Sequence, residues 1–324
     1  MHLRQLRTVA CGILLLISMI AFLQHLTQLG IILNREGTDD VTNRKRQSGL
    51  QVLEPAQFNN QSDVNCVNAI LGNLSFPMCI YNPQIDIFVS RMVIAGKYFE
   101  PDLVLKILKF FCIHPDLTFV DLGANLGTYS LPIAHSGIHV VSVEPHKDTV
   151  RRLAKSVHLG RIENNVDIFH YALSNEESTT FLKFNARNRG DTFMVGNGSC
   201  PGCLSVKMTV LNKLIPFIRH KKAFIKIDTQ EAEIKIFQRK GAAMFFDEID
   251  VVMILMEWVL YPQRYNKTED GRRKVDRFLE FFYQRGYEVY DPRTEKKLDA
   301  NWAKWSYDVL FKKEDLQKNQ LFLI

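Results

Sequence analysis

Short apolar segments alternate with helical segments along most of the chain, and this alternation is the strongest constraint on its fold. Residues 101–111, 147–159, 230–241 and 272–286 carry apolar side chains at helical spacing. The predicted strands between and around them are TFVDLG, HVVSVE, DIFHYA, AFIKID, VVMILMEW, YEVY and SYDVLF. This alternation is typical of a mostly parallel, doubly wound α/β sheet with helices on both faces. Ligands bind such sheets at the carboxyl ends of the strands, so we expect a site there.

The segment FVDLGANLGTYSL leads from a predicted strand into a predicted helix. The strand ends at Asp121, and Gly123 and Gly127 follow before the helix. Glycines let a backbone approach a ligand closely at a helix start, which favours a nucleotide-cofactor loop over an ordinary tight turn. Glu144 ends the next predicted strand about 20 residues later, where an acidic residue commonly binds ribose hydroxyls.

The spacing in this loop distinguishes between cofactors. A dinucleotide fingerprint would read Gly-x-Gly-x-x-Gly, but Asn125 stands where its second glycine would be. NAD-dependent oxidoreduction is therefore disfavoured. The sequence DLGANLG instead resembles the first motif of class I S-adenosylmethionine-dependent methyltransferases.

Further motifs narrow this resemblance to one family. The chain resembles the FkbM family of methyltransferases over about residues 118–311, in both the order and the spacing of the motifs. Those motifs are FVDLGANLGTYSL, VSVEPH, YALSNEESTTFLKF, FIKIDTQEAEIKIFQ, ILMEW and FFYQRGYEVYD. The resemblance implies a Rossmann-like, seven-stranded class I methyltransferase sheet whose last strand is antiparallel.

The resemblance also implies S-adenosylmethionine as the cofactor and assigns residues to three parts of it. The methionine end is assigned Asp121, Gly123, Ala124, Asn125 and Gly127, the ribose Glu144, and the adenine Ala172 and Leu173.

Asp228 matches the family's acid at the end of the fourth strand, facing the transferred methyl group. A sulfonium methyl is already activated, so the protein mainly needs to align the nucleophile and remove its proton. We expect Asp228 to be the base or to orient an acceptor hydroxyl, with Glu257 and His146 as further candidates. A structural role as a cap or hydrogen-bond partner is the alternative. No metal site is expected.

Glu231 is a departure from the family, whose members usually carry glycine at this position. Its spacing from Asp228 fits a capping box in which Asp228 caps the following helix, and Glu233 fits an acid in the first helical turn. The replacement of the glycine leaves open whether the chain transfers methyl groups, whereas DLGANLG and Glu144 favour cofactor binding.

The N-terminal segment predicts a membrane anchor. Residues 8–33 carry no formal charge apart from His25 when protonated, and about 20 apolar residues suffice to span a bilayer. A cleaved signal peptide is the alternative, but no small-x-small site closely follows Leu23. We therefore predict a cytoplasmic tail (1–7), a transmembrane signal anchor (8–33), a stem (34–63) and an FkbM-like domain (64–324).

Sequons and cysteines favour a luminal position for this domain. Glycosylation sequons begin at Asn60, Asn73, Asn197 and Asn266. Disulfides are plausible between Cys66 and Cys79 and between Cys200 and Cys203, which an oxidising compartment would permit. The second pair could instead form a redox motif or half of a zinc site. We expect a type II glycoprotein of the Golgi or endoplasmic reticulum.

Two functions follow from these features. The first is an S-adenosylmethionine-dependent O-methyltransferase that acts on a luminal acceptor, with a glycan hydroxyl as the leading candidate. The alternative is a non-enzymatic trafficking or adaptor protein on the same fold, like the Star protein of insects. The net charge of +6 is spread along the chain rather than gathered into a stripe, so we expect no nucleic-acid partner.

Overall fold

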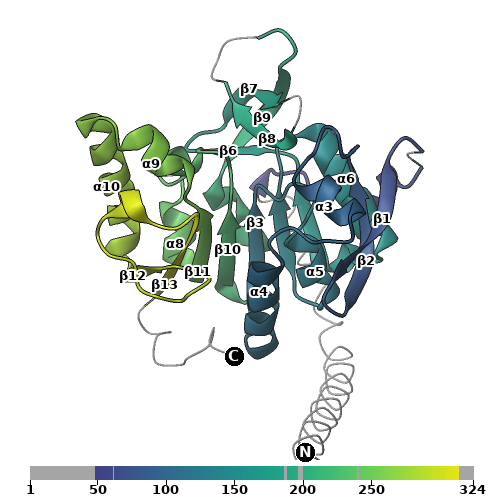
Figure 1. Ribbon diagram of the computed structural model, residues 1–324, viewed down its shortest axis with the longest axis horizontal. Helices are drawn as coiled ribbons and strands as arrows, with labels where there is room; N and C mark the ends of the chain where they lie inside the picture. Colours follow the sequence, from purple (N-terminus) through teal and green to yellow (C-terminus); the bar gives the residue numbers. More distant parts are fainter. Residues whose placement is uncertain (1–47, 61, 186–187, 196–199, 239–240, 314–324) are drawn as a thin grey trace, which may run out of the picture. The chain divides into compact units, whose positions relative to one another are not determined.

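The computed structural model describes residues 48–60, 62–185, 188–195, 200–238 and 241–313 (Figure 1). The chain divides into two units, Met1–Ser48 and Gly49–Ile324, and every element below belongs to the second. The predicted tail and transmembrane segment lie outside the described residues. Within the described part, no helix has the length and apolar character needed to cross a membrane.

The fold begins earlier in the chain than the predicted domain boundary at residue 64. Val52 bridges to Phe169, the amide of Leu53 donates to the Ile168 carbonyl at 2.9 Å, and Leu50 is buried. A short 3-10 helix, η1, follows at Pro55–Phe58. The last part of the predicted stem therefore belongs to the folded unit.

A seven-stranded sheet forms the centre of this unit, in the order β12-β13-β11-β10-β3-β4-β5. Its strands are β3 (Thr118–Leu122), β4 (Val140–Val143), β5 (Val166–Phe169), β10 (Lys222–Ile227), β11 (Asp250–Glu257), β12 (Tyr287–Tyr290) and β13 (Asp308–Lys313). The neighbours from β11 to β5 pair in parallel, whereas β13 is antiparallel to β11 and β12. The predicted α/β sheet and its antiparallel last strand are confirmed.

Helices cover both faces of the sheet, so the central strands show no apolar-polar alternation. Every residue of β3 and β4 is buried, as expected for strands that are packed on both sides. The helices are α3 (Val89–Ile94), α4 (Pro101–Ile113), α5 (Ser130–His135), α6 (Lys147–Leu159), α7 (Glu233–Ile236), α8 (Ala243–Glu248), α9 (Leu260–Tyr265) and α10 (Glu269–Tyr283). Side chains of α4, α5 and α6 belong to one apolar core, and those of α7, α8 and α10 belong to a second.

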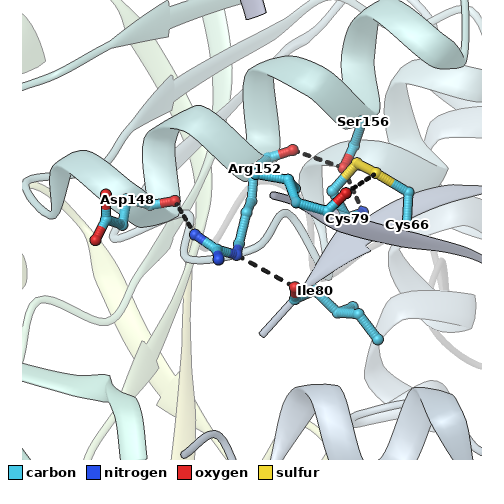
Figure 2. The surroundings of a disulfide bond; sticks show 7 residues. Cys66, Cys79, Ile80, Asp148, Arg152 and Ser156 are labelled. Atoms are coloured by element: carbon cyan, nitrogen blue, oxygen red, sulfur yellow. Dashed lines mark hydrogen bonds between the residues drawn. A yellow bond between two sulfur atoms is a disulfide. The ribbon is translucent and has the colours of Figure 1, made fainter. Parts of the chain in front are cut away.

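An N-terminal hairpin packs against α6. Its strands, β1 (Asn65–Leu71) and β2 (Leu74–Ile80), place Cys66 opposite Cys79, and the two form a disulfide. Two hydrogen bonds join the hairpin to α6 (Figure 2). The Cys79 amide donates to Ser156 Oγ at 2.8 Å, and Arg152 Nε donates to the Ile80 carbonyl at 3.2 Å. The predicted pairing of these cysteines is confirmed.

Cys200 and Cys203 are also disulfide-bonded. This pairing agrees with the predicted loop staple, and it is also the oxidised form that a redox motif would take.

A second, four-stranded sheet stands above the central one in Figure 1, in the order β6-β9-β7-β8. Its strands are β6 (Ala172–Ser174), β7 (Ser178–Asn185), β8 (Asn188–Met194) and β9 (Leu204–Val210). Short 3-10 helices complete the unit at Glu163–Asn165 (η2), Leu211–Phe217 (η3), Arg219–Lys221 (η4) and Trp302–Lys304 (η5). The sequence did not predict the second sheet. This sheet lies beyond one edge of the central sheet (Figure 1) and contributes residues to the pocket described below.

Candidate active site

A pocket lies where the carboxyl ends of the central strands meet the second sheet. The space inside it is about 580 Å³ when the open mouth and the adjoining solvent are counted. The central-sheet side is lined by Gly123, Asn125, Val143, Glu144, Pro145, Asp228, Thr229, Gln230 and Ala232, and the other side by Tyr171, Ala172, Leu173, Leu182, Gly190, Thr192 and Met194. Six of the predicted site residues, from four separate segments, therefore meet at one pocket: Gly123, Asn125, Glu144, Ala172, Leu173 and Asp228.

The two predicted glycines are required by contacts within the protein. Gly123 has φ +84°, and a Cβ there would lie 1.9 Å from the carbonyl oxygen of Asp228. Gly127 has φ +87°, and its Cβ would lie 2.6 Å from a Leu153 methyl carbon on α6. The chain's own atoms therefore require glycine at both positions, and Gly123 also lines the pocket, as the prediction of a cofactor loop expects.

Glu144 fixes the loop after β3 with both of its carboxyl oxygens. Oε2 accepts from the Asn125 amide at 3.0 Å, and Oε1 accepts from the His146 amide at 2.8 Å. Burial raises the pKa of Glu144 to about 7, although these two hydrogen bonds lower it. Each carboxylate oxygen has a second lone pair, so Glu144 can still accept hydrogen bonds from a ligand.

Asp121 is buried at the end of β3, beside this loop. Its Oδ2 accepts from Ser130 Oγ at 2.6 Å, and Ser130 Oγ also lies 2.8 Å from Ser142 Oγ. Among the described residues, Oδ1 is buried with no hydrogen-bond partner. Burial raises the pKa of Asp121, while Lys226 and Ser130 oppose that shift. An unpaired buried acceptor of this kind favours a donor or cation supplied by a ligand.

Asp228 is the centre of a polar cluster at the end of β10. Its Oδ2 lies 3.4 Å from Lys226 Nζ, and its Oδ1 accepts from Gln230 Nε2 at 2.9 Å. The same Gln230 nitrogen lies 3.5 Å from Glu257 Oε2 at the end of β11. Burial, and to a smaller extent the negative charge of Asp228, raise the pKa of Glu257 to about 9. Near neutral pH, Glu257 is therefore protonated and acts as a hydrogen-bond donor rather than as a base.

Lys226 supplies the positive charge of this cluster. Its ammonium lies 5.3 Å from the centre of the Tyr129 ring, and the Tyr129 hydroxyl donates to Glu100 at 2.7 Å. Burial alone would lower the pKa of Lys226, but the carboxylates around it, led by Asp228 and Asp121, raise it. Sequence analysis missed Lys226 because it lies in an apolar run. The available signal was its position two residues before Asp228, on the same face of β10.

Five predicted site residues lie outside the pocket lining, namely Asp121, Ala124, Gly127, His146 and Glu257. Of these, His146 and Ala124 have structural roles. His146 is the N-cap of α6, and its Nδ1 accepts from the Thr149 amide at 3.4 Å and lies 3.4 Å from the Tyr81 hydroxyl. Ala124 is buried, and its amide donates to the Val143 carbonyl at 3.0 Å. These contacts place His146 behind the rim rather than beside Asp228, so the structure does not support its prediction as a catalytic residue.

The capping-box prediction for Asp228 and Glu231 is wrong. Helix α7 begins at Glu233, and its N-cap is Ala232, which provides no side-chain cap. Glu231 instead has φ +72° and forms an ion pair with Arg264 of α9. Because an L-residue in this left-handed region is strained, the structure explains why glycine suits this position.

Glu233 takes the role that spacing suggested for Glu231. Its Oε1 accepts from the Thr229 amide at 2.8 Å and from the Thr229 hydroxyl at 2.9 Å. Its Oε2 accepts from the Tyr261 hydroxyl at 3.0 Å. Glu233 thereby ties the loop after β10 to α9 from a fully buried position.

We predict that replacing these two glutamates changes the free energy of unfolding by different amounts. Glu231→Gly removes an ion pair but also relieves left-handed strain, so the free energy of unfolding should stay within about 1 kcal/mol of wild type. Glu233→Ala leaves buried donors unpaired and should cost about 3 kcal/mol. Urea unfolding of both variants measures the difference. Equal losses in the two variants would contradict these assignments.

The raised carboxyl pKa values predict a pH-dependent stability. Glu144 and Asp308 have folded-state pKa values of about 7 and Glu257 of about 9, all above their ordinary values. Each therefore contributes stability that is full below the unfolded-state pKa and is lost as pH rises through the folded-state value. The free energy of unfolding of the ligand-free protein should fall as pH rises towards 9.

Glu257→Gln should flatten this fall between pH 7 and 9, the window that Glu257 dominates. The exposed Glu280→Gln is the matched control and should follow the wild-type curve. Urea unfolding at a series of pH values provides the measurement. An unchanged slope in Glu257→Gln would contradict the raised pKa.

The fold and the pocket together define a class of protein. A seven-stranded sheet with one antiparallel strand, and a pocket at the carboxyl ends that contains Glu144 and Asp228, is the arrangement expected of a class I methyltransferase. The family model "Methyltransferase FkbM domain" matches residues 121–289, which is more than half of the chain. The chain belongs to the FkbM methyltransferase family, and it is an S-adenosylmethionine-dependent methyltransferase. No curated protein matches it.

Solved structures similar to this chain include several methyltransferases. An O-methyltransferase from Bacillus cereus in complex with SAH is 13% identical, with 64% of this chain and 80% of that chain covered and a TM-score of 0.36. TomG from Streptomyces achromogenes, an O-methyltransferase in complex with SAM, is 10% identical, with coverages of 66% and 80% and a TM-score of 0.37. A precorrin-6y C5,15-methyltransferase from Geobacter metallireducens is 13% identical, with coverages of 71% and 95% and a TM-score of 0.34.

Metal ligands do not gather at this site. Within the ranges that the structure describes, no group of three or more His, Cys, Asp or Glu side chains could hold a metal ion.

Proposed function

We propose that this protein transfers a methyl group from S-adenosylmethionine to a hydroxyl of a luminal glycan. The observation that carries the proposal is the position of Asp228, which lines the cofactor pocket and belongs to a cluster of carboxyl groups around Lys226. A hydroxyl acceptor needs a proton acceptor beside the transferred methyl group, and we assign this role to Asp228.

The residues of the pocket fit S-adenosylmethionine. Asp121 does not itself line the pocket, but its Oδ1 is a buried acceptor without a partner in the described part of the chain, and we assign it to the ammonium group of the methionine end. Glu144 retains lone pairs for the ribose hydroxyls. Ala172 and Leu173 offer an apolar wall to the adenine. We thus propose for these residues the roles that the resemblance to the family implies.

The bound cofactor supplies a methyl group that is already activated on a sulfonium. The residues of the chain then align the acceptor and take its proton. Asp228 would take the proton of the acceptor hydroxyl as that oxygen receives the methyl group. Lys226 holds one oxygen of Asp228 and Gln230 holds the other, so the carboxylate has a fixed orientation. Protonated Glu257 can donate to a neighbouring oxygen of the acceptor.

The luminal setting is supported by cysteines and sequons. Two disulfides within the domain suit an oxidising compartment. Asn60, Asn73 and Asn266 are exposed, as glycosylation requires, and Asn197 lies outside the described residues. The type II orientation, the signal anchor and the residence in the Golgi or endoplasmic reticulum rest on the sequence.

Mass spectrometry of glycans from cells with and without the gene tests this proposal. We predict that one class of methylated glycans disappears with the gene and returns with the wild-type chain. Asp228→Asn keeps the shape of the side chain but accepts protons poorly, and it should restore less than about a hundredth of the methylation. Unchanged methylation in the absence of the gene would contradict the proposal and favour the adaptor alternative.

A further inference from the structure

The order of the strands separates two halves of the rim. Cofactor residues follow β3 and β4, and Asp228 follows β10 in the middle of the sheet. Beyond Asp228, on the side away from Glu144, lie the end of β11 and the start of antiparallel β13. In their register Glu257 faces Asp308, and Tyr307 immediately precedes β13. The rim therefore continues past Asp228 into a surface that no cofactor residue occupies.

Tyr307 is the exposed aromatic side chain of this surface. It is 54% exposed, yet its backbone is held: its carbonyl accepts from the amides of Trp258 at 2.7 Å and Val259 at 3.1 Å. The Tyr307 hydroxyl donates a hydrogen bond to Glu257. Burial raises the pKa of this hydroxyl, and the charges of Glu257 and Asp228 raise it further. A large ring that is fixed in place but open to solvent, beside carboxyl groups, is suited to bind a ligand that has both an apolar face and hydroxyl groups.

The charges around this surface are unfavourable to anions. Lys226 is surrounded by carboxylates, and Arg293 contacts Asp308 at 2.7 Å and Asp102 at 3.1 Å. Arg264 is paired with Glu231. Since these basic groups are already paired with acids, a phosphate or carboxylate on the acceptor would have to compete with those acids for them.

We propose that Tyr307, Glu257 and Asp228 form the acceptor subsite, and that it takes an uncharged sugar ring and rejects phosphorylated or carboxylated ones. The ring of Tyr307 stacks against the apolar face of the sugar. Glu257 and Gln230 bind neighbouring hydroxyls, and Asp228 receives the hydroxyl that is methylated. This inference rests on the proposed function and adds to it the binding surface and the charge class of the acceptor.

Ligand-observed NMR of the purified full chain, saturated with S-adenosylhomocysteine, tests the subsite. The probes are the methyl glycosides of glucose, galactose and mannose, with glucose 6-phosphate and glucuronic acid as anionic counterparts. We expect at least one neutral glycoside to bind and the two anions to bind more weakly. Tyr307→Ala should weaken neutral binding about tenfold, because stacking is lost. Tyr307→Phe keeps the ring and should stay within about threefold of wild type.

Two controls separate the possible failures. Tyr283→Ala removes a tyrosine of α10 that is 42% exposed, and it should leave sugar binding unchanged. The affinity for S-adenosylhomocysteine should be the same in all variants, which shows that each one folds. The subsite is overturned if no neutral glycoside binds, if the anions bind as tightly, or if Tyr307→Ala binds like wild type. The proposed function is judged separately, by whether cellular glycans lose methyl groups with the gene.

Discussion

The contact between the ends of β3 and β10 is the constraint on which the site depends. The carbonyl of Asp228 occupies the space where any side chain at Gly123 would begin, and the amide of Asp228 donates to the Leu122 carbonyl at 2.9 Å. This contact brings the cofactor loop and the acid at the end of β10 to one edge of the sheet. It also fixes the start of the loop in which Glu231 adopts a left-handed backbone. A side chain at Gly123 would separate the two halves of the site.

The rim concentrates carboxyl groups where water is largely excluded. Burial raises the pKa values of Asp121, Glu144 and Glu257, so the fold loses stability where these groups must ionise. The positive charge of Lys226 at the end of β10 compensates for part of the negative charge of these carboxyl groups. A cationic ligand would compensate for more of it, which fits a sulfonium cofactor and a neutral acceptor. The strained backbone at Glu231 and the buried carboxyl groups thus lie at the same site. Such destabilising features are common at functional sites, where activity requires them.

The sequence predicted those features that local chemistry determines. The strand before Gly123, the acid at Glu144 and the acid at Asp228 are each identified by a short motif, and all three meet at the pocket. The sequence did not predict the second sheet. Its strand β9 pairs with β6 and β7, which are distant in sequence, and only β7 and β8 form a local hairpin. The capping-box roles predicted for Asp228 and Glu231 are wrong, because α7 begins only at Glu233 and the backbone at Glu231 is left-handed. Spacing alone does not reveal such a turn.

Calorimetric titration of the purified full chain with S-adenosylmethionine tests the central claim, that the rim of the sheet is the cofactor site. We predict saturable binding by wild type and a loss of at least about tenfold in affinity for Glu144→Ala, because the ribose hydroxyls lose their acceptor. Glu163→Ala, a glutamate of η2 outside the pocket lining, should bind like wild type. Absence of binding by wild type, or equal binding by Glu144→Ala, would contradict this account.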